Sequence, residues 1–119
     1  MEAREYLKQI KDDGWYLHDT DGRTRQYVHR EREGFLTACV RHNDVLGPAS
    51  EAAALRAAEA DIEGMPEVVV ETTERGASAY CANLPGVVAT GADEVSTRER
   101  MSEAVALHRR ALSGEAPEV

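Results

Sequence analysis

The chain has 119 residues, a length that favours one ordinary domain or two very small ones. Charged residues make up 30% of the sequence and hydrophobic residues 42%, which is typical of a globular protein and excludes a disordered one. The formal net charge of −8 argues against a nucleic-acid binder that works mainly by neutralising phosphates. Residues 1–61 hold nine Lys and Arg against twelve Asp and Glu, and residues 62–119 hold five against ten, so neither half is a basic module.

The sequence also indicates where the protein works. No apolar run approaches the roughly 20 residues of a membrane-spanning helix, and the N-terminus has no signal-peptide pattern. We therefore expect a cytoplasmic protein with reduced cysteines. Cys39 and Cys81 stand apart among apolar neighbours, without a Cys-x-x-Cys pair, so the sequence predicts buried thiols and neither a metal site nor a cofactor.

The N-terminal segment predicts a helix followed by a hairpin. Apolar residues at helical spacing predict a helix over Glu2–Asp13, which Gly14 ends as a C-cap. Two short alternating runs, Trp15–His18 and Thr24–His29, flank Asp21-Gly22. This arrangement predicts a hairpin, because a type I′ turn needs positive φ at both central residues and Asp-Gly supplies it.

The next segment completes the first half. Phe35–Arg41 predicts a third antiparallel strand. Pro48 favours the start of a second helix, and the alanine-rich run Ala49–Asp61 continues it. The order helix, three strands, helix is similar to that of a double-stranded-RNA-binding domain.

Particular residues of this half carry a family resemblance. Gly14-Trp15 opens the first strand, and Gly22-Arg23-Thr24-Arg25-Gln26-Tyr27 opens the second, with His29 behind it. The pattern resembles the HicA family of bacterial mRNA-interferase toxins, which has Gly-Trp, then Gly-Ser-His with an aromatic residue, then a His near the strand end. The resemblance covers residues 1 to about 60. It places Thr24 at the position of the family's catalytic histidine, and a threonine hydroxyl does not titrate near neutral pH.

The second half predicts three strands and a helix. Its apolar runs and turn residues predict strands near residues 67–73, 77–83 and 86–90 and a helix near residues 94–113. Asp93 or Ser96 is predicted to cap this helix, and Glu99, three residues after Ser96, matches a capping box with it. The helix then carries one apolar stripe at 3.6-residue spacing, which includes His108.

Two motifs of the second half resemble the core of HicB antitoxins. These are Leu84-Pro85-Gly86 and Ala89-Thr90-Gly91, although Ala82-Asn83 replaces the usual Pro-Asp of that family. Glu103-Ala104 and Leu107-His108 match residue pairs of the family's helix. The resemblance implies a partly ribonuclease-H-like domain, and the chain shows no sequence for the DNA-binding domain that many HicB proteins carry.

We therefore predict an α+β protein with two domains. Residues 1–61 form a HicA-like α-β-β-β-α half with the double-stranded-RNA-binding-domain-like arrangement. Residues 62–119 form a HicB-like β-β-β-α half that is partly ribonuclease-H-like and has no DNA-binding domain.

No residue is predicted with confidence to be catalytic. If another histidine replaced the missing catalytic one, it would be His29 or His18. Thr24 and His29 are an odd number of residues apart, which places Thr24 and His29 on opposite faces of a regular strand. The RNA- or partner-binding residues that we predict are Arg23, Thr24, Arg25, Tyr27, His29 and His42. The alternative, which the charge count favours, is a solvated hairpin whose arginines pair with nearby carboxylates.

The sequence thus predicts a catalytically degenerate HicA–HicB fusion that works by binding a HicA-type toxin, RNA or a second copy of itself. Two alternatives remain, an autoinhibited mRNA endonuclease and a stable relic without activity. We expect a homodimer or larger assembly. The connector of about six residues reaches at most about 20 Å, which predicts that it is too short for the second half to cover the hairpin face of its own first half.

Overall fold

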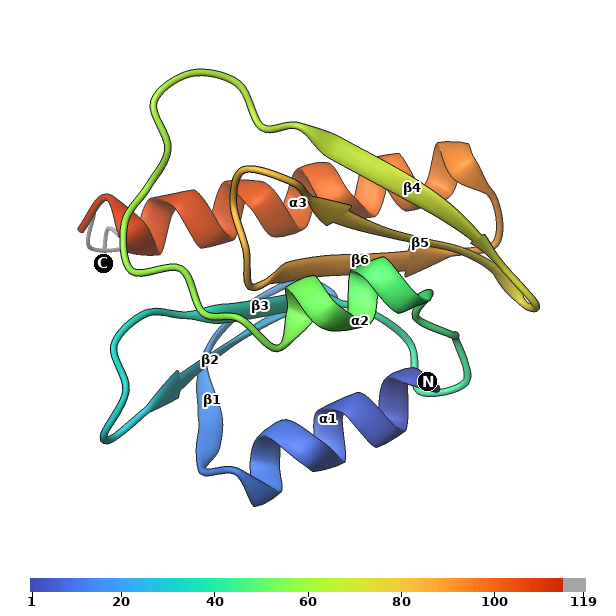
Figure 1. Cartoon of the computed structure of the whole chain (residues 1–119). Coiled ribbons are helices and arrows are strands. Elements are labelled where there is room, and N and C mark those ends of the chain that lie inside the picture. The colour runs from blue at the N-terminus through green and yellow to red at the C-terminus, as the bar shows by residue number, and fades with distance from the viewer. Residues whose placement is uncertain (115–119) are drawn as a thin grey trace.

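The computed structural model describes residues 1–114 and has an α+β fold built on one mixed six-stranded sheet (Figure 1). The helices are α1 (Ala3–Asp12), α2 (Pro48–Ala54) and α3 (Glu94–Leu112). The strands are β1 (Trp15–Asp21), β2 (Thr24–His29), β3 (Leu36–Cys39), β4 (Val68–Thr73), β5 (Gly76–Cys81) and β6 (Val87–Gly91). None of the helices in residues 1–114 has the length and apolar character needed to cross a membrane.

The sheet joins the two halves of the chain at its centre. Its strand order is β1-β2-β3-β6-β5-β4, and neighbouring strands within each half are antiparallel. The central pair, β3 and β6, is parallel, with Thr37 opposite Val87 and Cys39 opposite Ala89. The N–H of Thr37 also donates to the carbonyl of Gly86 at 2.7 Å, which extends this pairing by one bond. Segments 1–61 and 62–114 therefore contribute three strands each to a single sheet.

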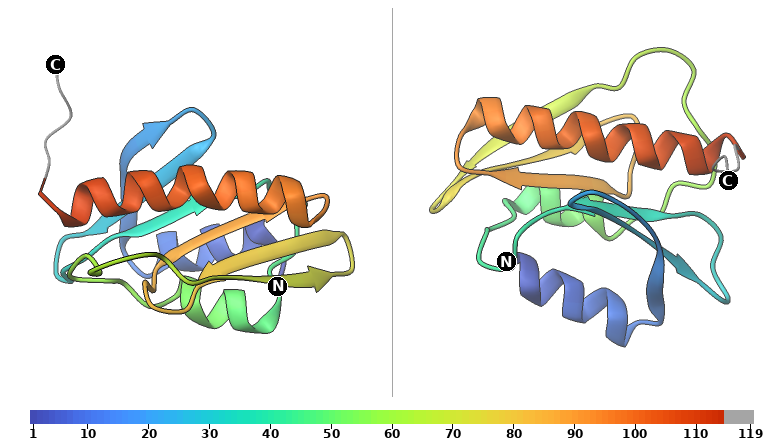
Figure 2. Two further views of the ribbon diagram at one scale, coloured as in Figure 1. Left: turned by 90° about the horizontal axis from the view of Figure 1, so that it is seen from above. Right: turned by 180° about the vertical axis from the view of Figure 1, so that it is seen from behind.

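Helices cover both faces of this sheet. The helix α3 lies across one face and contacts β2 to β6, whereas α1 and α2 lie on the other face (Figures 1 and 2). Because successive side chains of a strand point to opposite faces, Val88 packs under α1 and α2 while Val87 and Ala89 pack under α3. All five residues of β6 are buried, as expected for a strand covered on both faces.

The order and type of the predicted elements are confirmed, and the largest boundary error is in the second helix. The second helix ends at Ala54, although the sequence predicted that it continues to Asp61. The chain turns at Leu55, and Ala58 then forms a β-bridge with Phe35 beside the strand β3. An alanine-rich helix buries little apolar surface of its own, so the pairing with Phe35 prevails over helix propensity here.

The connector is longer than the sequence indicated, because α2 ends early. The helix α3 contacts β2 and β3 of the same chain, so the prediction that the second half cannot reach the first half's hairpin face is wrong. The length of the connector therefore no longer supports self-association, which stays a prediction.

A carboxylate from the second half closes the start of α2. Glu71 of β4 accepts from the N–H of Ser50 at 2.6 Å, from the Ser50 hydroxyl at 2.7 Å and from the N–H of Ala49 at 3.3 Å. The Ser50 hydroxyl also contacts the Ser78 hydroxyl at 2.8 Å. The first N–H groups of a helix lack partners within the helix, and here Glu71 satisfies two of them from a distant part of the sequence.

We expect Glu71→Ala to lower the free energy of unfolding by about 1–3 kcal/mol, because it removes three hydrogen bonds to a charged acceptor. Denaturant unfolding followed by Trp15 fluorescence measures this. The matched control is Glu74→Ala, since the side chain of Glu74 is exposed and forms no hydrogen bond or ion pair within residues 1–114. Equal losses in the two variants would contradict the capping role of Glu71.

Candidate functional site

The position of Thr24 lies beneath α3. Thr24 and Gln26 point to the same face of β2 and are each only 1% exposed. The side-chain amide of Gln26 donates to the carbonyl of Leu107 in α3 at 3.3 Å. At the mouth of the hairpin, the guanidinium of Arg23 pairs with the carboxylate of Glu103 at 2.8 Å. The second half of the chain therefore covers this part of the first half.

A chain of buried hydrogen bonds fixes α3 on the sheet. The amide of Gln26 donates to the Thr37 hydroxyl at 3.3 Å, and Thr37 Oγ1 lies 2.7 Å from Nδ1 of His108. Nε2 of His108 lies 3.1 Å from the carbonyl oxygen of Pro85. Burial lowers the pKa of His108 to about 4, so its ring is neutral at pH 7. A carbonyl only accepts, so Nε2 carries the single ring proton and Nδ1 accepts from the Thr37 hydroxyl.

The small cavity beside Thr24 contains no proton-transfer group that titrates near pH 7. It has a volume of about 190 Å³ and is lined by Arg23, Cys39, Val40, Arg41 and Arg100. Arginine stays protonated in proteins, and burial raises the pKa of the Cys39 thiol. The arginines of this cavity are able to bind an anionic group, but none of the lining side chains is suited to take a proton from a 2′-hydroxyl.

His29 lies on the opposite face of β2 from Thr24 and is fully engaged with the backbone. Its Nε2 donates to the carbonyl of Asp13 at 2.7 Å, and its Nδ1 accepts from the N–H of Glu31 at 3.0 Å. The edge of the ring meets the Trp15 ring, with 5.3 Å between the ring centroids. His29 thus ties the end of β2 to the end of α1.

His18 is exposed on β1, and its ring lies 6.0 Å from the Phe35 ring. It makes no side-chain hydrogen bond within the described part of the chain. Neither His18 nor His29 forms a hydrogen bond with the side chain of another titratable residue within residues 1–114, so no pair suited to acid and base catalysis is formed.

The other predicted binding residues gather on the face that carries α1. Arg25, Tyr27 and His42 line a pocket of about 530 Å³ between α1 and the hairpin. Lys8 and Lys11 of α1 also line it. The sequence prediction missed these two lysines, although their i, i+3 spacing places them on one helix face.

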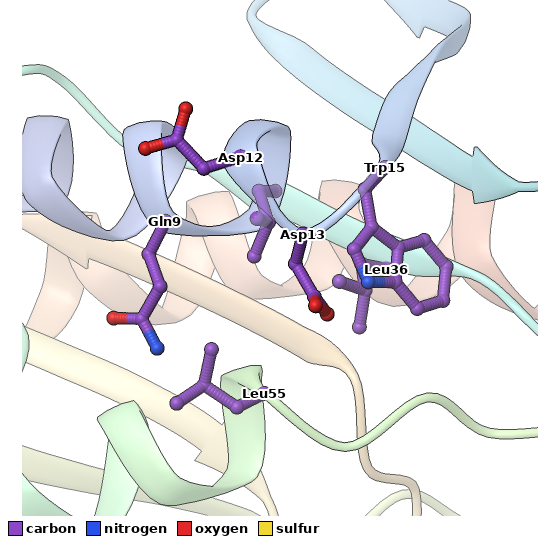
Figure 3. A pocket seen from close by; sticks show the side chains of 7 residues that line it. Gln9, Asp12, Asp13, Trp15, Leu36 and Leu55 are labelled. Carbon is purple, nitrogen blue, oxygen red and sulfur yellow. The ribbon is translucent and has the colours of Figure 1, made fainter.

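A second pocket lies on the other side of α1 and is acidic. It has a volume of about 440 Å³ and is lined by Gln9, Ile10, Asp12, Asp13, Trp15, Leu36 and Leu55. Figure 3 shows Gln9 and Asp13 pointing toward Leu55, whereas Asp12 points away from it. A hydrogen bond from Arg32 lowers the pKa of Asp13. No group of three or more His, Cys, Asp or Glu side chains in residues 1–114 is placed to hold a metal ion.

Comparisons of the chain with models of protein families, with curated proteins and with solved structures find no match. The resemblance to HicA and HicB proteins therefore stays a prediction that rests on the residues of this chain.

The buried His108 predicts a specific dependence of stability on pH. The pKa of His108 is about 4 in the folded protein against an ordinary value of 6.5, so the unfolded chain binds the proton more readily. This contribution to stability is complete above pH 6.5 and is lost as the pH falls toward 4. We expect the wild-type protein to lose about 2–3 kcal/mol from it between pH 7.5 and pH 4.5, as measured by denaturant unfolding.

The matched variant is His108→Gln, which retains one donor and one acceptor but does not titrate. It should show a loss smaller by about 2 kcal/mol over the same pH range. Carboxylates such as Asp44 and Asp93, whose pKa values are lowered, act below about pH 4 and affect both proteins alike. Identical pH profiles would contradict the neutral, buried state of His108.

Proposed function

We propose that this chain is a HicA–HicB-like fusion in which the HicB-like half covers the HicA-like half, and that it acts by binding rather than by cleaving RNA. The element order α1-β1-β2-β3-α2 supports a double-stranded-RNA-binding-domain-like first half, and β4-β5-β6-α3 supports a HicB-like, partly ribonuclease-H-like second half. The observation that carries the proposal is the burial of Thr24, at 1% exposure, beneath α3 of the same chain.

The chemistry around Thr24 supports the loss of catalysis. Cleavage of RNA without a metal needs a group that titrates near pH 7 to take the 2′-hydroxyl proton. Thr24 has no such group, and the neighbouring Arg23, Arg41 and Arg100 supply only positive charge. A strand of RNA also has no direct access to a side chain this deeply buried.

The alternative is an autoinhibited mRNA endonuclease that uses His29 or His18. A general base needs a lone pair directed at its substrate, and the Nδ1 lone pair of His29 already accepts from the N–H of Glu31. This favours a structural role for His29. The alternative then depends on His18, which is exposed but has no partner residue that orients its ring by a hydrogen bond within residues 1–114.

If the protein acts by binding, it has three candidate kinds of partner, namely a HicA-type toxin, RNA or a second copy of the chain. The strands β1 and β4 are the two edges of the sheet, and edge strands carry backbone groups that pair with other chains. On β1, Tyr16 is 48% and Leu17 53% exposed, and a bulge between Leu17 and Asp19 interrupts the ladder. The first three residues of β1 thus offer the clearer docking edge.

The test compares four proteins for RNA cleavage and for toxicity in a bacterial host. The wild-type chain and its residues 1–61 should both be inactive, because neither has a base at position 24. Thr24→His in residues 1–61 should restore part of the activity, since general acid–base groups contribute ~10²–10⁴-fold. Thr24→His in the full chain should stay inactive, because α3 covers the position.

Two controls make the comparison decisive. Thr24→Gln in residues 1–61 adds a side chain of similar size that does not titrate. Circular dichroism and Trp15 fluorescence establish which of the truncated proteins are folded. Cleavage of RNA by wild-type residues 1–61 that is abolished by His18→Ala or His29→Ala would overturn the proposal and establish the endonuclease instead.

A further inference from the structure

The pocket between α1 and the hairpin is separate from everything that α3 covers. It lies on the opposite face of the sheet from Thr24, and we refer to it as the α1–hairpin pocket. Its volume of about 530 Å³ lies within the ~300–1,000 Å³ that is usual for small-molecule sites. It is lined by Leu7, Lys8, Lys11, Trp15, Tyr16, Leu17, Arg25, Tyr27 and His42.

The charge of the lining is opposite to that of the chain as a whole. The chain has a formal net charge of −8, yet the pocket is lined by two lysines, an arginine and a histidine, and by no carboxylate. Lys8 is paired with Asp12 at 2.9 Å. Lys11 and Arg25 form no ion pair with any residue that the structure describes. Two cations at this pocket are therefore available to an anionic ligand.

The wall formed by the hairpin is apolar and aromatic. Leu17 and Tyr27 are opposite each other in the ladder of β1 and β2, so their side chains lie on one face beside Arg25. Leu17 is 53% exposed and Tyr27 is partly buried. A planar group placed against them would remove this apolar surface from water, and every nucleobase offers such a planar face.

We propose that the α1–hairpin pocket binds a nucleoside phosphate, with the phosphate at Lys11 and Arg25 and the base against Leu17 and Tyr27. The negative charge of the chain opposes the approach of a long polyanion, so one nucleotide unit is the ligand that the pocket selects. A free mononucleotide and a single nucleotide of an RNA strand share this chemistry. The inference does not rest on the loss of catalysis at Thr24, because no residue of α3 or of the Thr24 cavity takes part. The exposed residues that the pocket shares with the edge of β1 are Tyr16 and Leu17.

The experiment is a titration of the full ¹⁵N-labelled chain, followed by NMR, with adenosine and guanosine 5′-monophosphate, adenosine alone and inorganic phosphate. We expect shifts of the amides of α1, β1 and β2 around the pocket, with a Kd of roughly 0.1–1 mM for the mononucleotides. Adenosine and phosphate alone should each bind at least about tenfold more weakly, because each makes only part of the contacts.

The variants Lys11→Gln and Arg25→Gln test the two cations. Each should weaken mononucleotide binding about tenfold, which is the loss expected for one charge-assisted hydrogen bond. The matched control is Arg56→Gln, because Arg56 is exposed after α2 and has no ion pair within the described residues. It should bind mononucleotides as the wild type does.

Three results would overturn the inference. The first is the absence of shifts at about 10 mM mononucleotide, a hundredfold above the tighter expected Kd. The second is equal binding of phosphate and mononucleotide, which would show an anion contact without a base site. The third is mononucleotide binding by Arg25→Gln that is as tight as that of the wild type. A further titration with single-stranded RNA distinguishes a free mononucleotide from a nucleotide of an RNA strand as the ligand. RNA binding that is no tighter per nucleotide than mononucleotide binding, and that Arg25→Gln weakens to the same extent, supports the inference. RNA binding without any mononucleotide binding contradicts it.

Discussion

The parallel pairing of β3 with β6 is the constraint on which the rest of this structure depends. It joins the two halves of the chain into one sheet, so that β3 is an interior strand of that sheet. It also gives α3 a continuous surface that runs from β2 to β6. Because a shift of one residue would move every side chain of β6 to the other face, the register is fixed by the burial of Val87 and Ala89 under α3 and of Val88 under α1 and α2.

Polar contacts between the halves hold this arrangement from three sides. His108 meets Thr37 beneath α3, Glu71 caps α2 on the opposite face, and the Thr90 hydroxyl donates to Asp44 at 2.6 Å at one end of the sheet. Each of these hydrogen bonds would be lost in a separated half, and a hydrogen bond of this kind contributes ~0.5–3 kcal/mol to stability. The halves are therefore expected to stay together, which supports a module in which α3 remains over Thr24 while the sheet edges and the α1–hairpin pocket stay accessible.

Local patterns in the sequence were enough to predict the elements but not how they meet. Asp21-Gly22 and the periodicity of residues 94–113 predicted the hairpin and α3, because their signals lie within a few residues. The predicted type I′ turn is wrong, since the central turn residues are Gly22 and Arg23 and only Gly22 has a positive φ. The pairing of β3 with β6 joins residues about 50 positions apart and leaves no local pattern, so the covering of Thr24 was not predicted. His108 stood in the apolar stripe of its helix, yet only its tertiary partners show that it is buried and neutral. Lys8 and Lys11 were missed because their pocket forms only when α1 packs beside the hairpin.

Native-state hydrogen exchange in increasing denaturant tests most directly whether the two halves form one closed unit. We expect the slowest amides of β2 and β3 and those of β5 and β6 to exchange through the same opening, with equal free energies and equal dependence on denaturant. That result would mean that α3 leaves the Thr24 face only when the whole sheet unfolds. Protection of β5, β6 and α3 that persists after β2 and β3 have exchanged would contradict it, because the halves would then open independently.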